Sequence, residues 1–327
     1  MNIDPTINIL CAADDNYAPY CGIMLTSLFE NNKDCHFEVW VFVDGSFSED
    51  NKRKYSLLGQ KYGQEIVLQK IDEMNIQGFP INERMHITLS TYYRLFASEL
   101  LPRYMHKVIY LDCDIIVVGG IKQLWDIDLH DIAIGGVLGF RPSYSDKCDC
   151  LGYSRTFGYF NAGVLLINLD YWREKSLSKK VFDFISVHHS SLPWMDQDAL
   201  NGVLYNSKEI LPARYNFMTM VFLKDCWENY AKETQHYYLD EFKKRVVVHY
   251  VGGEKPWIYR TYGGPFFSDW EKYRRKSLWK DCRDTKPLQK HFKHLIKRYT
   301  FPHFFRKQHS QWVVLSESKR AFQDCII

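Results

Sequence analysis

The sequence predicts an α/β protein with a mostly parallel central sheet covered by helices on both faces. Three observations lead to this prediction. Apolar strand-like segments alternate with helical segments along the first third of the chain, as in successive β-α-β units. Aspartates follow directly after several of these strands, where open α/β sheets bind their ligands. The chain has 327 residues, 46% of them hydrophobic, which is enough for one large core.

The elements of the first third follow one another in regular order. The predicted strands are short apolar runs at Ile7–Ala13, Phe37–Val43, Glu65–Ile71 and Lys107–Leu111. The predicted helices between them are Tyr20–Glu30, Ser48–Lys61 with Ser48 as N-cap, and Ser90–Leu101, which ends at Pro102.

The second half continues with four segments that carry polar residues. Tyr159–Asn168 is predicted as a buried strand, and a helix is expected to begin at Trp194. Pro212–Met218 is predicted as an aromatic-rich loop. Val246–Val251 is predicted as a strand that runs into the Gly252-Gly253 turn.

Two carboxylates interrupt the apolar run between Lys107 and Val118. Asp112 and Asp114 are two residues apart, so in an extended chain both side chains lie on the same side. Desolvating two neighbouring anions is costly, which favours a bound divalent cation between them. Two solvated aspartates at the end of a strand are the alternative, and the motif by itself supports both interpretations equally.

His249 and Lys255 flank the glycine turn after the predicted strand at Val246–Val251. Each residue alone is more typical of a core histidine or a solvated lysine. Together, an imidazole, a glycine turn and a point cation would complete a metal-diphosphate site with the two aspartates.

Several function classes lack their sequence signatures. No Gly-x-Gly-x-x-Gly follows the first strand and no P-loop occurs, so a usual dinucleotide fold and a P-loop enzyme are not supported. The nine cysteines show no disulfide-framework spacing, the N-terminus has no basic n-region, and no run approaches the ~18 apolar residues of a membrane span. We therefore expect a protein of the cytosol.

Positive charge is concentrated near the C-terminus. Between Trp270 and Lys307 there are thirteen Lys and Arg against three Asp and Glu, whereas the whole chain carries a net charge of only +3. After Pro287, apolar residues recur at helical spacing among lysines, which predicts a basic amphipathic helix. We expect an anionic membrane surface as the partner of this segment. A helix packed on the core is the main alternative, and nucleic acid is the least favoured.

Five segments in series resemble the signature of glycosyltransferase family 8, and in particular the bacterial lipopolysaccharide galactosyl- and glucosyltransferases. They are Ala12–Tyr17, Asp112–Asp114, Phe160–Asn168, Asp196–Asp198 and His249–Trp257. The resemblance implies one Rossmann-like, nucleotide-sugar-binding domain of GT-A type over residues 1–262. Residues 263–327 would form the basic, aromatic, helical extension that attaches to the membrane.

The resemblance also implies roles for individual residues. Asp112, Asp114 and His249 would ligate Mn²⁺, with Mg²⁺ as a substitute, and Gln197 and Asp196 would be the catalytic residues. Donor binding would involve Asp14, Asn16, Tyr17, Arg94, Asp112, Cys113, Asn161, Gly252 with Gly253, and Lys255. His86 and Thr91 match positions on the acceptor side. Gly139 departs from the family pattern, which has an aspartate there.

The function implied is retaining, metal-dependent transfer of galactose or glucose from a UDP-sugar to lipopolysaccharide or another lipid-linked glycan. The enzyme would be bacterial and would bind peripherally to the inner face of the membrane. Front-face substitution assisted by Gln197 is favoured, because an amide oxygen is a poor nucleophile, and Asp196 as a transient nucleophile is the alternative. Two other functions remain open: a self-glucosylating, glycogenin-like primer and a non-catalytic nucleotide-sugar or glycan-binding module.

Overall fold

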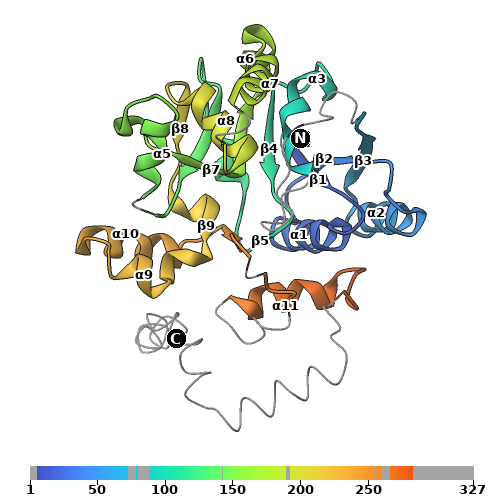
Figure 1. Ribbon diagram of the computed structural model, residues 1–327. Helices are drawn as coiled ribbons and strands as arrows, with labels where there is room; N and C mark the ends of the chain where they lie inside the picture. Colours follow the sequence, from blue (N-terminus) through green and yellow to red (C-terminus); the bar gives the residue numbers. More distant parts are fainter. Residues whose placement is uncertain are drawn as a thin grey trace, which may run out of the picture.

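A computed structural model describes residues 6–72, 79, 89–141, 143–188, 192–253, 255–258 and 266–282. Its centre is a seven-stranded sheet of order β3-β2-β1-β4-β7-β6-β8 (Figure 1). The strands are β1 (Ile7–Ala13), β2 (Phe37–Val43), β3 (Glu65–Lys70), β4 (Lys107–Leu111), β6 (Ile134–Leu138), β7 (Phe160–Asn168) and β8 (Lys208–Ile210). Strand β7 runs antiparallel to β4 and β6, and the other neighbours in this sheet are parallel. The prediction of a mostly parallel α/β sheet is confirmed.

Strand β1 is buried on both faces, and its side chains alternate between two cores. Ile9 and Cys11 face the core beneath α1 (Ala18–Asn31) and α2 (Glu49–Tyr62), while Leu10 faces a second core. The second core is covered by the following helices: α3 (Ala97–Leu100), α6 (Leu169–Lys175), α7 (Leu177–His188) and α8 (Met195–Leu204). Helices therefore lie on both faces of the sheet, as predicted.

A second, three-stranded sheet of order β5-β10-β9 lies beside the end of β4. Its strands are β5 (Ile115–Val117), β9 (Phe217–Met218) and β10 (Val247–His249). Antiparallel pairing of β10 with β5 sets His249 opposite Ile115, one residue after Asp114. This pairing brings together two segments that are more than 130 residues apart in the sequence.

The remaining helices in the described residues are α4 (Lys122–Trp125), α5 (Tyr144–Cys150), α9 (Lys224–Trp227), α10 (Lys232–Lys243) and α11 (Phe267–Lys276). No helix of the described residues is long and apolar enough to span a membrane.

Two predicted elements differ from the structure. The helix predicted at Ser90–Leu101 is a 3₁₀ helix, Leu89–Phe96, followed by the single turn of α3. Thr91 and the two tyrosines after it have low helix propensity, and the side chain of Arg94 donates to the Thr91 carbonyl, a group that an α-helix would use itself. The loop predicted at Pro212–Met218 contains a 3₁₀ turn and ends in β9, because Phe217 and Met218 pair with β10.

The described part of the C-terminal segment packs against the rest of the fold. Helix α11 runs beneath α1 in Figure 1, and Trp270, Tyr273 and Trp279 are buried in the same core as α1. Trp279 donates to Asn51 at 2.8 Å, and its ring occupies the space above Gly22, where an added Cβ would lie 2.1 Å from it. These three aromatic rings are therefore core residues and are not available to a lipid headgroup region. The amphipathic helix predicted after Pro287 lies outside the described residues.

We predict that Trp279→Ala lowers the free energy of unfolding by about 3–5 kcal/mol, because it leaves a cavity between α1 and α2. Chemical denaturation followed by tryptophan fluorescence and circular dichroism would measure this loss. Tyr104→Ala is the control, since the Tyr104 residue is 65% exposed and its loss should change stability little. Equal stability of the two variants would show that the segment after α11 does not support the core.

Candidate active site

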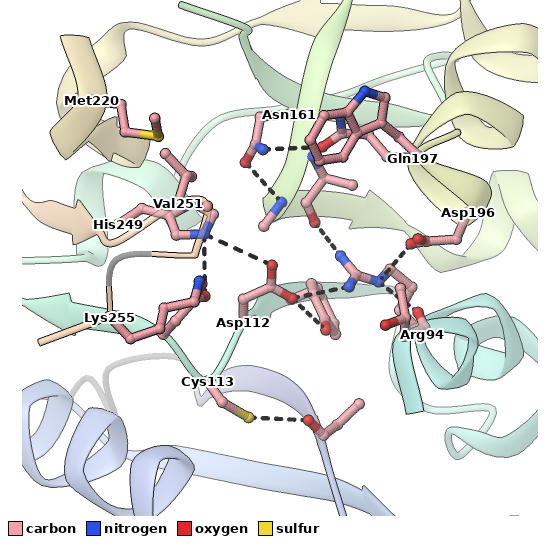
Figure 2. Close-up of a pocket in the computed structure, with 18 of the residues that line it drawn as sticks. Arg94, Asp112, Cys113, Asn161, Asp196, Gln197, Met220, His249, Val251 and Lys255 are labelled. Atoms are coloured by element: carbon pink, nitrogen blue, oxygen red, sulfur yellow. Dashed lines mark hydrogen bonds and ion pairs between the residues drawn. The ribbon is translucent and has the colours of Figure 1, made fainter. Parts of the chain in front are cut away.

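A cavity of about 450 Å³ opens at the carboxyl ends of β1 and β4 (Figure 2). This volume lies in the range of small-molecule binding sites. Its lining includes residues from both sheets, from the 3₁₀ helix before α3, and from the start of α8. These include Tyr17, Thr91, Arg94, Asp112, Cys113, Asp114, Asn161, Asp196, Gln197, His249, Gly252 and Lys255.

Asp112, Asp114 and His249 form a cluster that can hold a metal ion. Each offers one ligand atom, and these atoms all lie within 4.8 Å of one another. His249 Nε2 is 3.1 Å from Asp114 Oδ1 and 3.9 Å from Asp112 Oδ2. Two carboxylates and one imidazole on one side of an open cavity fit a divalent cation such as Mn²⁺ or Mg²⁺, and they leave further coordination positions for a ligand.

Arg94 and Tyr110 hold the Asp112 carboxylate in place. Arg94 Nη2 lies 3.0 Å from Asp112 Oδ1, and the Tyr110 hydroxyl donates to the same oxygen at 2.8 Å. Arg94 is buried, and its Nη1 donates to the Ala162 carbonyl. The guanidinium also lies over the Tyr110 ring at 4.3 Å. With Oδ1 occupied in this way, Asp112 presents Oδ2 toward His249 (Figure 2).

Lys255 forms an ion pair with Asp114 and donates to the Tyr250 carbonyl at 2.8 Å. Burial raises the pKa of the Asp114 carboxyl, but Lys255 and His249 lower it by more, so the net pKa lies below its usual value. Asp114 is therefore ionised throughout the physiological pH range, which is the form a metal ligand requires.

Gly163 of β7 is the floor beneath the metal cluster. A Cβ added there would lie 2.2 Å from His249 Cε1 and 2.8 Å from Asp112 Oδ2. Only glycine allows the imidazole and the carboxylate to approach β7 this closely.

Gln197 lies at the start of α8 and faces β7. Its Oε1 accepts hydrogen bonds from Asn161 Nδ2 and from the Ala162 backbone N–H, both at 3.0 Å, and its Nε2 donates to the Tyr159 hydroxyl at 2.9 Å. The amide is therefore fixed in one orientation, with its oxygen engaged by two donors.

Asp196 and Asp198 flank Gln197 and have different surroundings. Asp196 is 3% exposed, and its Oδ2 lies 3.1 Å from Arg94 Nε but has no hydrogen bond of good geometry. Burial raises the pKa of the Asp196 carboxyl to about 7, although Arg94 opposes this shift. Asp198, in contrast, accepts from the Trp194 N–H at 2.7 Å and the Tyr159 hydroxyl at 2.6 Å, so it serves as an anchor for α8.

The predicted nucleotide side lies where β1 ends. Asp14 Oδ1 accepts from the Tyr17 N–H at 2.8 Å and so caps the first turn before α1. Tyr17 lines the cavity, while Asn16 is exposed beside it. Trp257 packs edge-on against Tyr17 at 6.2 Å between ring centroids.

Asp15, the neighbour of Asp14, has a structural role instead. Its carboxylate accepts from the N–H of Ser48, the N-cap of α2, at 2.8 Å.

The other predicted residues fall into three groups. Thr91 and Gly252 line the cavity, and Gly252 has a positive φ of 79°, which favours glycine. The Cys113 thiol points away from the cavity and donates to the Ala12 carbonyl, so only the backbone of this residue is available to a ligand. His86 lies outside the described residues.

Four residues that hold the site together were not predicted from the sequence to do so. They are Tyr110, Tyr159, Asn216 and Asp198, which anchors α8. Tyr110 had a usable signal, because a residue two positions before Asp112 in a strand lies on the same face. Asn216 had none, because only the pairing of β9 with β10 brings it next to His249.

A family model for glycosyl transferase family 8 matches residues 8–261. The chain belongs to glycosyltransferase family 8. General stress protein A of Bacillus subtilis (strain 168) is 32% identical over 284 residues, which cover 85% of this chain and 96% of that protein. The lipopolysaccharide 1,3-galactosyltransferase of Salmonella typhimurium is 28% identical over 310 residues, covering 92% and 86% of the two chains. The lipopolysaccharide 1,2-glucosyltransferase of Escherichia coli (strain K12) is 26% identical over 311 residues, covering 92% and 88%.

The fold agrees with the family. The crystal structure of galactosyltransferase LgtC in complex with donor and acceptor sugar analogues superposes with a TM-score of 0.72 at 28% identity, covering 86% of this chain and 98% of that chain. The fold is thus of the GT-A type, and the protein is a glycosyltransferase. The cavity of Figure 2 lies within the matched residues and is its candidate active site.

We predict that Gly163→Ala weakens Mn²⁺ binding at least about tenfold while the protein stays folded. The new methyl group pushes His249 and Asp112 apart, and small displacements of ligands have large effects on a metal site. Titration calorimetry with MnCl₂, together with a thermal melt, would measure both properties.

Gly45→Ala is the matched control for this glycine substitution. Its Cβ would meet only the Lys70 side chain, at an ordinary distance of 3.6 Å. If Gly163→Ala bound Mn²⁺ as tightly as Gly45→Ala does, the cation would not lie between Asp112 and His249.

Proposed function

We propose that this glycosyltransferase transfers galactose or glucose from a UDP-sugar to a saccharide acceptor, with a divalent cation, preferably Mn²⁺, and with retention of anomeric configuration. The observation that carries the proposal is the cluster of Asp112, Asp114 and His249 at the floor of the cavity. Retention is the property of the family, and the hexose is suggested by the names of the lipopolysaccharide glucosyl- and galactosyltransferase relatives.

The donor would lie across the cavity from the end of β1 to the start of α8. Uracil and ribose would lie near Asp14, Asn16 and Tyr17, which gather where β1 ends. The diphosphate would lie between the metal cluster and the turn at Gly252 and Gly253. The hexose would then face Arg94, Asn161, Asp196 and Gln197, the polar residues at the far side of the cavity.

Charge compensation explains why the reaction would occur here. Breaking the bond between the anomeric carbon and the diphosphate leaves negative charge on the departing oxygen. A bound divalent cation supplies Lewis-acid stabilisation of that charge. Lys255 adds a fixed positive charge at the same edge of the cavity, because the Tyr250 carbonyl and Asp114 hold its ammonium group.

The surroundings of Gln197 favour front-face substitution, in which the acceptor hydroxyl attacks on the side that UDP leaves. The Gln197 oxygen accepts two hydrogen bonds, which further reduces its nucleophilicity. Asp196, the alternative nucleophile, is close to Arg94, and its raised pKa leaves part of it neutral near pH 7. Both features make a covalent intermediate less favourable, so Gln197 would act by stabilising positive charge that develops on the sugar.

Part of the cavity wall is aromatic. Tyr144 and Trp194 line it, and the Tyr144 ring fills the space next to Gly139, where an added Cβ would lie 2.1 Å from ring atom Cδ2. A side chain at position 139 would displace this ring. The donor hexose would therefore meet an aromatic ring here, where the family pattern has a carboxylate. The acceptor we propose is lipopolysaccharide or another lipid-linked glycan.

Incubation with a panel of UDP-hexoses tests the proposed function. We expect slow hydrolysis of UDP-galactose or UDP-glucose with Mn²⁺, loss of hydrolysis with EDTA, and a decrease of at least about 100-fold in Asp114→Asn, since one ligand charge is removed. Asp170→Asn is the control, because Asp170 is exposed and pairs with His106 away from the cavity.

Three results would contradict this proposal in different ways. Turnover that persists in EDTA would exclude the metal, and UDP-sugar binding without any turnover would favour a non-catalytic module. A growth in protein mass with UDP-glucose alone would favour a self-glucosylating primer.

We further propose that the basic C-terminal segment attaches the enzyme to the inner, cytoplasmic face of a membrane. In the described part of this segment, Arg274 is buried in a bidentate pair with Glu271, and Lys276 pairs with Glu30. These cations neutralise carboxylates of the protein. Membrane attachment would therefore depend on residues 283–307, which contain eight Lys and Arg and a single acidic residue.

We predict that the full chain binds anionic vesicles and that a chain ending after Cys282 does not, while both hydrolyse the UDP-sugar at similar rates. Ending the chain at Cys282 keeps Trp270, Tyr273 and Trp279 in the core, whereas ending it at Tyr262 would remove them. Vesicle sedimentation should show weaker binding as salt is added, since screening over a Debye length of ~8 Å acts on exposed charges. Binding that ignores salt and lipid charge would overturn this proposal.

A further inference from the structure

The metal cluster and Gln197 are joined by a continuous row of hydrogen-bonded side chains, in which His249 and Asn216 are buried and Asn161 and Gln197 are half-buried. His249 Nδ1 lies 2.8 Å from Asn216 Oδ1, and Asn216 Nδ2 donates to Asn161 Oδ1 at 2.8 Å. Asn161 Nδ2 in turn donates to Gln197 Oε1 at 3.0 Å (Figure 2). Asn216 is fully buried, so no solvent competes for its amide.

Two backbone groups of β7 determine the direction of every hydrogen bond in this row. The Gly163 N–H donates to Asn161 Oδ1, and the Ala162 N–H donates to Gln197 Oε1, both at 3.0 Å. A backbone N–H can only donate, so each of these two side chains must present its oxygen to β7. The sheet pairing of β7 with β4 and β6 fixes both donors in space.

This direction decides which nitrogen of His249 carries the proton. Because Asn161 Oδ1 is an acceptor, the group of Asn216 that faces it must be the NH₂ group. Asn216 therefore turns its oxygen toward His249, and an oxygen acceptor requires a proton on Nδ1. Nε2 is left with a free lone pair, directed at the position between Asp112 and Asp114 where a cation would bind.

The hydrogen bonds at the opposite end of the row also have a fixed direction. Because the Gln197 oxygen accepts from the Ala162 N–H of β7, the NH₂ group of Gln197 faces the Tyr159 hydroxyl. The hydroxyl oxygen must therefore accept this hydrogen bond. The hydroxyl proton is then free to point at Asp198, whose oxygen lies 2.6 Å away. Asp198 also accepts from Lys147 at 3.1 Å. The hydrogen bonds of the row are thus compatible with one arrangement of donors and acceptors only.

We propose that Asn216 is a positioning residue that holds His249 in the Nδ1-protonated form required of a metal ligand and couples that ligand to Gln197. This inference rests on the proposed metal-dependent function. In the other tautomer a proton on Nε2 would point at the cation position and prevent coordination. A hydrogen-bond acceptor for the second nitrogen is how proteins fix the orientation and tautomer of a histidine that binds metal.

Two substitutions at one position separate the two roles of Asn216. Asn216→Leu has a similar size and removes both hydrogen bonds. Asn216→Asp keeps an acceptor for His249 Nδ1 but cannot donate to Asn161 Oδ1. We expect Asn216→Leu to bind Mn²⁺ about 10–100-fold more weakly. We expect Asn216→Asp to bind Mn²⁺ at least as tightly as the unmodified protein and yet to hydrolyse the UDP-sugar more slowly.

Electron paramagnetic resonance of free Mn²⁺ would measure affinity, and ¹⁵N NMR of histidine-labelled protein would report the tautomer without any metal. A resonance pattern with the proton on Nδ1, lost in Asn216→Leu, supports the proposal. Asn32→Leu is the matched control, because Asn32 is a buried asparagine with three hydrogen bonds far from the cavity. It should lose stability and keep its affinity for Mn²⁺.

The outcomes distinguish failure of this inference from failure of the proposed function. If unmodified protein and His249→Ala bind Mn²⁺ equally, the proposed metal site is wrong, and the ¹⁵N pattern still decides the tautomer. If the unmodified protein binds Mn²⁺ and both Asn216 variants bind it alike, whether tightly or weakly, Asn216 has no specific role toward His249. A proton on Nε2 in the unmodified protein would overturn the inference directly.

Discussion

The partial burial of two carboxylates at the end of β4 is the constraint on which the rest of the site depends. Asp112 and Asp114 follow a strand buried on both faces, and two adjacent anions there would be strongly destabilising without compensation. Arg94 and Lys255 supply it within the protein, and His249 completes the cluster that could hold a cation. Arg94 pairs with Asp112, Lys255 pairs with Asp114, and His249 lies between the two carboxylates. The positions of these three groups in turn require the 3₁₀ helix before α3, the glycine turn after β10, and the second sheet.

The antiparallel strand β7 organises the other half of the site. Gly163 lets His249 and Asp112 approach the strand, and the neighbouring backbone N–H groups orient Asn161 and Gln197. One strand therefore sets the position of the candidate metal ligands and of the residue proposed to stabilise the sugar. Preorganisation of this kind matters for catalysis, because polar groups that are fixed before the reaction need not reorient as charge develops.

The C-terminal segment has two parts that differ in their role. In the first part, Trp270, Tyr273 and Trp279 complete the core against α1, and their cationic neighbours Arg274 and Lys276 pair with glutamates of the protein. In the sequence this part resembles residues 283–307, since both stretches are basic and aromatic. Burial assigns the first part to the core, because an aromatic ring inside the core contributes to the stability of the fold rather than to binding a surface.

The sequence by itself determined the alternating fold, the limits of β1, β2 and β4, and the Asp112 and Asp114 pair, because periodicity and the spacing of the two aspartates are local properties. The resemblance to the family added His249. The sequence did not reveal that β7 is antiparallel, that Leu89–Phe96 forms a 3₁₀ helix, or that Trp279 is buried. These depend on strand pairing and on contacts between distant segments. Asn216 is the clearest case: its neighbours in the sequence are aromatic core residues, and only the pairing of β9 with β10 places its amide between Asn161 and His249. Local chemistry could thus identify the candidate ligands, whereas tertiary structure decided which atom of each one faces the position proposed for the cation.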